Sequence, residues 1–152
     1  MKLVDFEVLD YLTQRCGLIA QSLEKGIKLE VIGSSVQLHS HPEILLKVIS
    51  QLVNNSCTHG FATQHAGNIS IEVKEQDEWV VIMYEDNGVG ISEEDQQHIF
   101  DPFYTSQLGQ GNLGLGLNIA YNSVVHVLKG EISYEHQPTG AKFIVRIPKN
   151  IE

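Results

Sequence analysis

The sequence predicts an α+β fold, in which a mixed, mostly antiparallel sheet is covered by helices on one face. Patterns typical of helices and of strands are interspersed along the chain, and most strand patterns are separated by short turns, as in hairpins. Apolar residues within the patterns recur on one face, as expected for elements that share a core. The 152 residues, 42% of them hydrophobic, suffice for a single globular domain over residues 1–152.

The first half of the chain carries two helical patterns and one clear strand pattern. A helix is predicted over residues 3–24, where apolar residues recur near one face. Residues 27–32 alternate between apolar and polar and predict a half-buried strand, and residues 36–38 predict a second, shorter one. Pro42 suits a helix start, so a second helix is expected over residues 41–58.

A hairpin and a short helix are predicted next. Residues 68–74 and Trp79–Asp86 are expected to pair antiparallel across a turn at residues 75–78. Ser92 is followed by three acids, which is typical of a helix N-terminus, and this helix is expected to end near Phe100.

The last part of the chain predicts a loop, a long helix and a second hairpin. The loop covers residues 101–113, and an apolar helix is expected over residues 115–129. Strands are predicted at Glu131–Glu135 and at residues 142–147, joined by a Gln-Pro-Thr-Gly turn at residues 137–140.

Composition excludes several classes of function. The formal net charge is −9, which argues against a nucleic-acid surface. No apolar run reaches the ~18 residues of a membrane span, and the first residues lack the apolar stretch of a signal peptide. Cys16 and Cys57 form no Cys-x-x-Cys motif, as is usual in a reducing compartment. We therefore expect a cytoplasmic domain with no nucleic-acid partner and no direct membrane contact.

Positive charge is absent from one long stretch of the chain. No Lys or Arg occurs between Lys74 and Lys129. An anion bound by this stretch would depend on backbone N–H groups and on a metal ion. The alternative is that the stretch forms a solvated acidic surface.

Two glycine-containing segments predict a ligand-binding site. Asp86 ends an apolar strand pattern and is followed by Gly88 and Gly90, which let a ligand approach the backbone. Residues 109–117 are rich in Gly and lead into the helix expected over residues 115–129, whose free N–H groups suit phosphate. An acid and a phosphate cradle together predict a nucleotide that is held at both ends.

The second predicted helix directs one amide side chain towards the interior. Gln51 and Asn55 are stacked one turn apart on an edge of its apolar arc, whereas Asn54 falls on the solvent side. The helical geometry therefore selects Asn55 rather than Asn54 as the inward polar residue. Taken alone, such an Asn could equally satisfy a loop backbone.

Four segments, in this order, resemble the motifs of one family. They are residues 51–61 (Gln-Leu-Val-Asn-Asn-Ser-Cys-Thr-His-Gly-Phe), 86–90 (Asp-Asn-Gly-Val-Gly), 100–105 (Phe-Asp-Pro-Phe-Tyr-Thr) and 114–117 (Gly-Leu-Gly-Leu). Over essentially its whole length the chain resembles the catalytic and ATP-binding domain of sensor histidine kinases, which are grouped with gyrase, the Hsp90 chaperones and the MutL proteins. The resemblance implies their two-layer α/β sandwich, the Bergerat-type ATP-binding fold.

The resemblance also implies roles for individual residues in binding ATP and Mg²⁺. Asp86 would accept a hydrogen bond from the adenine amino group, although by itself it could simply cap a turn. Asn55 would hold the Mg²⁺ that bridges the phosphates, since an amide oxygen is a hard ligand, and Gln51 occupies the neighbouring catalytic position. Phe100 and Phe103 would pack down a lid over the phosphates. The other expected nucleotide contacts are His59, Gly88, Gly90, Ile91, Phe103, Thr105, Gly111, Leu113, Gly114, Leu115, Gly116 and Leu117.

The chain departs from the family pattern at several positions. Gln51 stands where gyrase and Hsp90 carry an acid that activates water, and Gln cannot act as a general base. Ala141 replaces the Thr that usually precedes the last strand, so a hydroxyl near Asp86 is missing or is supplied from elsewhere. His59 would contact phosphate if protonated, or be a plain surface or core histidine. The remaining departures are at Thr58, Gln107 and Asn112.

The sequence therefore predicts a domain that binds Mg-ATP and transfers the γ-phosphoryl group to a histidine on a separate dimerisation hairpin. Such a domain acts in two-component signal transduction, with a response regulator as the downstream partner. No His in the chain precedes an acid, as the family's acceptor motif requires. We thus expect this to be one domain of a longer kinase, which is either soluble or membrane-anchored. Two alternatives are a serine kinase of the anti-sigma type and a degenerate scaffold domain that binds nucleotide weakly.

Overall fold

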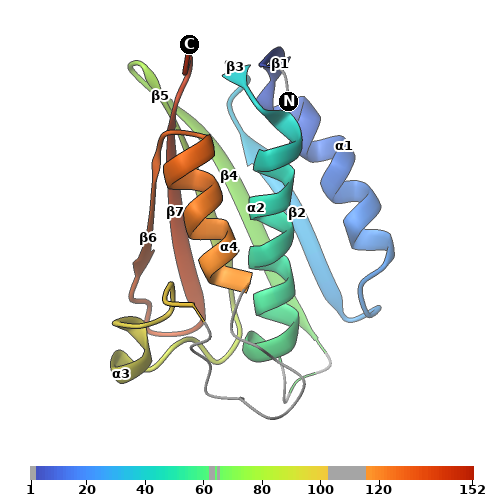
Figure 1. The fold of residues 1–152 in the computed structure, drawn as a ribbon. Coiled ribbons are helices and arrows are strands. Elements are labelled where there is room, and N and C mark those ends of the chain that lie inside the picture. Colours follow the sequence, from blue (N-terminus) through green and yellow to red (C-terminus); the bar gives the residue numbers. More distant parts are fainter. Residues whose placement is uncertain (1–2, 62–63, 65, 103–115) are drawn as a thin grey trace.

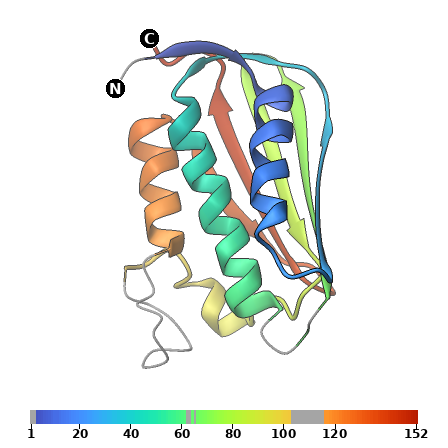
Figure 2. The same cartoon turned by 90° about the vertical axis from the view of Figure 1, so that its right-hand side faces the viewer.

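The computed structural model describes residues 3–61, 64, 66–102 and 116–152, which form a five-stranded sheet, a two-stranded ribbon and a layer of helices. The helices α1, α2 and α4 lie side by side on one face of the sheet (Figure 1, Figure 2). In chain order the elements are β1 (Val4–Glu7), α1 (Val8–Gln21), β2 (Ile27–Gly33), β3 (Gln37–Ser40), α2 (Pro42–Asn55), η1 (Ser56–Gly60), β4 (Gly67–Gln76), β5 (Trp79–Asp86), α3 (Glu93–Gln96), α4 (Gly116–Asn122), η2 (Ser123–Val127), β6 (Glu131–Glu135) and β7 (Ala141–Pro148).

The five strands are ordered β2-β4-β5-β7-β6, and only the pairing of β2 with β4 is parallel. A parallel pair needs a long crossover connection, and here β3, α2 and η1 provide it. The other neighbours are antiparallel, including the hairpins β4–β5 and β6–β7. This confirms the predicted fold class, a mixed and mostly antiparallel sheet covered by helices.

The core lies between the sheet and the helices. Alternate residues of β4, β5 and β7 are buried, which is the period of two expected for strands with one covered face. The buried residues of α2 recur every three or four positions and form the opposing surface: Leu45, Val48, Ile49, Leu52 and Val53. Within the described residues, none of the helices combines the length and the apolar character that a membrane span requires.

The first predicted helix was wrong at its N-terminal end. Residues 4–7 form strand β1 instead, paired antiparallel with β3 in a register that places Phe6 opposite Leu38. The helix α1 begins only at Val8, where the Glu7 side chain accepts a hydrogen bond of 3.2 Å from the N–H of Asp10. Strand pairing with a distant segment overrides the local helical pattern.

The helices α2 and α4 both end in a wider, π-helical turn, η1 and η2 respectively. In η1 the N–H of Phe61 donates to the carbonyl of Ser56 at 2.8 Å, and in η2 the N–H of Leu128 donates to the carbonyl of Ser123 at 2.9 Å. Such turns close over five residues rather than four and are frequent at functional sites. The helices predicted over residues 41–58 and 115–129 are therefore present, with changed geometry at their C-terminal ends.

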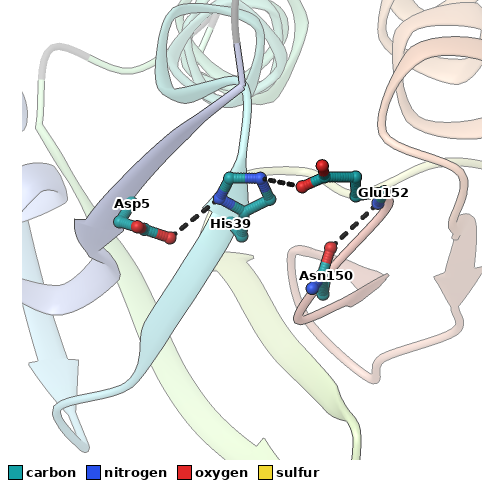
Figure 3. A network of polar contacts seen from close by, with 4 residues as sticks. All are labelled: Asp5, His39, Asn150 and Glu152. Carbon is teal, nitrogen blue, oxygen red and sulfur yellow. Dashed lines mark hydrogen bonds and ion pairs between the residues drawn. The ribbon is translucent and has the colours of Figure 1, made fainter.

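The C-terminal segment is fastened to the β1–β3 ribbon by a polar network around His39 (Figure 3). The His39 ring lies 2.8 Å from Asp5 Oδ1 on one side and 2.8 Å from Glu152 Oε2 on the other. The backbone N–H of His39 also donates to the carbonyl of Lys149 at 2.7 Å. Hydrogen bonding to Asp5 raises the pKa of His39, and the contact with Glu152 adds to this effect.

The raised pKa predicts that this network stabilises the fold in acid more than in base. The protonated ring is favoured in the folded state, so its contribution is complete below about pH 6.5, the usual pKa of an unfolded His, and is lost as the pH rises through the higher folded pKa. His39→Gln should therefore lower the free energy of unfolding more at about pH 5.5 than at about pH 8.5. Urea denaturation of both proteins at the two pH values measures this difference.

The matched control is His126→Gln, which changes an exposed His outside the network. An equal loss of stability from His39→Gln at both pH values would contradict the protonated network.

Candidate functional site

Asp86 is the last residue of β5, and its carboxylate is enclosed by donors from three parts of the chain. Oδ1 accepts hydrogen bonds from the N–H groups of Gly88, at 3.0 Å, and Ala141, at 3.1 Å. Oδ2 accepts one from Ser56 Oγ at 2.6 Å. Asp86 does cap the turn after it, but two of its three donors come from distant segments. The residue is 6% exposed. A carboxylate has about four acceptor positions, and the donors from the described residues leave one of them, at Oδ2.

The glycines next to Asp86 allow two backbone segments to touch. A Cβ atom on Gly88 would overlap the carbonyl of Gly60, and the N–H of Val89 donates to that same carbonyl at 2.9 Å. Gly90 has a φ of +78°, which side chains rarely tolerate. The turn after β5 is thus held directly against η1, and a Cβ on Gly60 would lie only 3.2 Å from Asp86 Oδ2.

The end of α2 lies beside both Asp86 and the start of α4. Gln51 Oε1 is 3.0 Å from where a Cβ on Gly116, the first residue of α4, would stand. Asn55 lies one helical turn later and is half-buried, whereas Asn54 is exposed, as the helical-face argument predicts. The next residue, Ser56, contacts Asp86. Figures 1 and 2 show that the C-terminal end of α2 and the N-terminal end of α4 lie at the same end of the domain.

His59 lies in η1 and is half-buried. Burial lowers its pKa below the usual value, so the ring is neutral at neutral pH. His59 therefore brings no positive charge to this end of the domain under those conditions.

Lys142 lies next to the site in the sequence, but its side chain is on the other face of the sheet. Lys142 comes directly after Ala141 in β7, and successive residues of a strand point to opposite faces. Its Nζ lies 3.3 Å from Glu85 Oε1 and 3.8 Å from Glu135 Oε1. Residues 75–128 contain no Lys or Arg, and Lys142 does not supply the missing positive charge to the site.

The segment from Gly90 to Phe100 is packed onto the domain next to Asp86. Ile91 packs against the core, and its carbonyl accepts a 2.9 Å hydrogen bond from Gln96 Nε2. The Phe100 ring lies 6.2 Å from Phe143 and 5.6 Å from Tyr121, measured between ring centroids. Phe100 thus anchors the C-terminal end of this segment against β7 and α4. The predicted site residues Phe103, Thr105, Gly111, Leu113, Gly114 and Leu115 lie outside the described residues, while Gly116 and Leu117 begin α4.

Two residues of this site were not predicted from the sequence. Ser56 is fully buried, and its Oγ lies 2.6 Å from Tyr84 Oη as well as 2.6 Å from Asp86. Tyr84 is also fully buried. The available signal was the spacing of Tyr84 and Asp86, which are two apart on one strand and so share a face.

A metal ion at this site would have few protein ligands. Among residues 3–61, 64, 66–102 and 116–152, no group of three or more His, Cys, Asp or Glu side chains is arranged to hold one. The half-buried Asn55 offers a hard amide oxygen, which suits Mg²⁺ when phosphate and water complete the shell. The donor set therefore fits a cation that arrives with a phosphate ligand.

Comparison with known proteins identifies the family of this chain. Residues 40–151 match the family described as histidine kinase-, DNA gyrase B-, and HSP90-like ATPase. The sensor histidine kinase GlnK of Bacillus subtilis is 29% identical over 129 residues, which are 78% of this chain and 31% of GlnK. The histidine-protein kinase AfsQ2 of Streptomyces coelicolor is 34% identical over 113 residues, 72% of this chain and 20% of AfsQ2. The chain thus spans less than a third of these relatives.

Among solved structures, the catalytic domain of the histidine kinase ThkA superposes with a TM-score of 0.85 at 25% identity, covering 99% of this chain and 97% of that one. The fold, the matched family and the relatives agree. The chain belongs to the histidine kinase-, DNA gyrase B- and HSP90-like ATPase family, as an ATP-binding catalytic domain of the sensor histidine kinase type.

Proposed function

We propose that this domain binds Mg-ATP in the cytoplasm and donates the γ-phosphoryl group to a histidine on a separate dimerisation domain of a larger sensor kinase. The observation that carries the proposal is the enclosed carboxylate of Asp86, with three donors in place and one acceptor position left. The adenine amino group would fill that position, whereas guanine carries a carbonyl there and would be repelled. Gly88, Gly90 and Ile91 would border the base.

The phosphates would lie towards Asn55, Gln51 and the start of α4. In this proposal Asn55 holds the metal ion, which neutralises phosphate charge when bound. Because residues 75–128 contain no Lys or Arg and His59 is neutral, that ion would matter more than in relatives with a lysine nearby. Gln51 cannot take a proton from water, so the bound nucleotide would be spared from hydrolysis.

The phosphoryl acceptor and its base would come from another domain. None of the histidines in the chain is followed by an acid, and phosphoryl transfer asks mainly for positioning and charge neutralisation from the ATP-binding side. The histidine kinase ThkA has been solved in complex with a response regulator protein, TrrA. We propose a response regulator as the downstream partner here as well.

A second candidate function is a scaffold that binds nucleotide weakly without transfer. The lack of cations in residues 75–128 and the Gln at position 51 favour it. Catalysis is preferred because the Asp86 carboxylate is held by three donors and the named relatives are kinases.

Asp86→Asn should weaken ADP and ATP binding alike and should reduce the preference for adenine over guanine nucleotides. Loss of a charge-assisted hydrogen bond costs ~1.5–3 kcal/mol, roughly ten- to a hundredfold in affinity. Calorimetric titration with ADP and GDP measures both effects. The control is Asp77→Asn, at an exposed turn position. Unchanged ADP affinity in Asp86→Asn would remove Asp86 from the site.

Asn55→Ala should abolish the Mg²⁺-dependent preference for ATP over ADP, while the neighbouring Asn54→Ala should have little effect. Asn55 is half-buried, and Asn54 is exposed. Affinities for both nucleotides, measured with Mg²⁺ and with a chelator, test this difference. Equal effects of the two substitutions would contradict a metal ligand at Asn55.

The domain alone should neither label itself with γ-labelled ATP nor hydrolyse ATP at an appreciable rate. Mixed with the dimerisation domain of the kinase that carries it, it should label a histidine there, giving an acid-labile and base-stable product. A dimerisation domain with that histidine replaced is the control. Strong labelling of this chain by itself would indicate a different acceptor, and no label in any mixture, with ATP bound, would favour the scaffold.

A further inference from the structure

Ser56 is the contact between α2 and the carboxylate on which the proposed function rests. It is the first residue of η1, directly after Asn55, and is fully buried. Its Oγ lies 2.6 Å from Asp86 Oδ2 and 2.6 Å from Tyr84 Oη. Two oxygens at such distances require one hydrogen between each pair.

The donor of each hydrogen bond follows from the number of hydroxyl hydrogens available. A carboxylate oxygen only accepts, so the single hydroxyl hydrogen of Ser56 is directed to Asp86. The hydrogen between Ser56 and Tyr84 must then come from the phenol. Tyr84 Oη also donates to the carbonyl of Leu52 at 3.0 Å, since that carbonyl accepts the N–H of Ser56 with only one of its two lone pairs; the phenol hydrogen is therefore shared between Ser56 Oγ and Leu52. The result is a buried relay in which Tyr84 donates to Ser56, and Ser56 donates to Asp86.

The opposite side of Asp86 lacks a hydroxyl. Ala141 donates its N–H to Oδ1 but has only a methyl side chain. The hydroxyl that accompanies the carboxylate thus comes from the end of α2 and not from the start of β7. Because Oδ1 is held by two N–H groups and Oδ2 by Ser56, both oxygens have a fixed direction.

We infer that Ser56, supported by Tyr84, is a positioning residue for adenine recognition: from the end of α2 it orients the Asp86 carboxylate. This inference rests on the proposed role of Asp86 in binding the adenine amino group. It assigns to Ser56 no contact with the nucleotide itself.

The test compares ADP with the diphosphate of purine riboside, which lacks the amino group. The wild-type domain should prefer ADP. Ser56→Ala should lower ADP affinity roughly tenfold, the scale of one hydrogen bond to a charged group, and should change affinity for the analogue much less. Tyr84→Phe, which keeps the ring and Ser56, should shift the preference in the same direction but less. The control is Ser123→Ala, a buried serine in η2.

A second-site variant makes the test specific. Ser56→Ala combined with Ala141→Thr should restore the preference for ADP, because a hydroxyl is returned to Asp86 from β7. A purely structural role of Ser56 would instead lower affinity for both nucleotides equally and would not be repaired by Thr at 141, and that result overturns the inference.

The outcomes separate this inference from the proposed function. If the wild-type domain does not distinguish ADP from the analogue, adenine recognition by Asp86 fails, and the inference falls with it. If the wild type and Asp86→Asn behave as proposed but Ser56→Ala keeps the ADP preference, only the inference is wrong. If Ser56→Ala does not fold, Tyr84→Phe decides: a reduced preference supports the relay, and an unchanged preference overturns it.

Discussion

A carboxylate can be buried only where donors surround it, and in this domain that requirement links three separate parts of the chain. The donors to Asp86 come from the turn after β5, from the start of β7 and from the end of α2. The pairing of β5 with its neighbours must be in register, since a slip of one residue along β5 would turn the Asp86 side chain to the other face of the sheet. The direct contact of Gly60 with Gly88 fixes the helix end against the same turn. The site is thus part of what aligns the helix layer with the sheet.

The sequence was a good guide to those elements whose burial repeats with a clear period. The apolar arc of α2 and the alternation in β5 each arise from one covered face, and both were predicted. The strand β1 was not, because Val4–Glu7 also fits a helical pattern, and the partner that makes it a strand lies about thirty residues away in β3. Local patterns contain no information about such a partner. The π-helical ends of α2 and α4 were missed for the same reason, since they depend on what the last turn packs against.

The candidate site was predicted where a side chain has one clear orientation. Asp86 ends a strand and Asn55 lies on a helix edge, so the pattern predicts where both residues lie, while their roles come from the resemblance and stay predictions. Ser56 was missed because a Ser near a helix end is usually an ordinary polar residue, and its burial arises only when η1 closes over β5. The prediction that a hydroxyl near Asp86 is either missing or supplied from elsewhere is answered by Ser56. The glycine-rich segment remains a prediction from sequence, since residues 103–115 lie outside the described residues.

The His39 network lies at the end of the domain where the two chain termini meet. It joins β1 to the last residues of the chain, while the C-terminal ends of β5 and α2 lie at the opposite end of the domain (Figure 1). A tether fixed to either terminus would therefore leave the end that carries the proposed nucleotide site facing away from the tether. If such a tether swings, the outward end moves through the widest arc. Surface immobilisation or a dye at either terminus would for the same reason leave the proposed nucleotide site unobstructed.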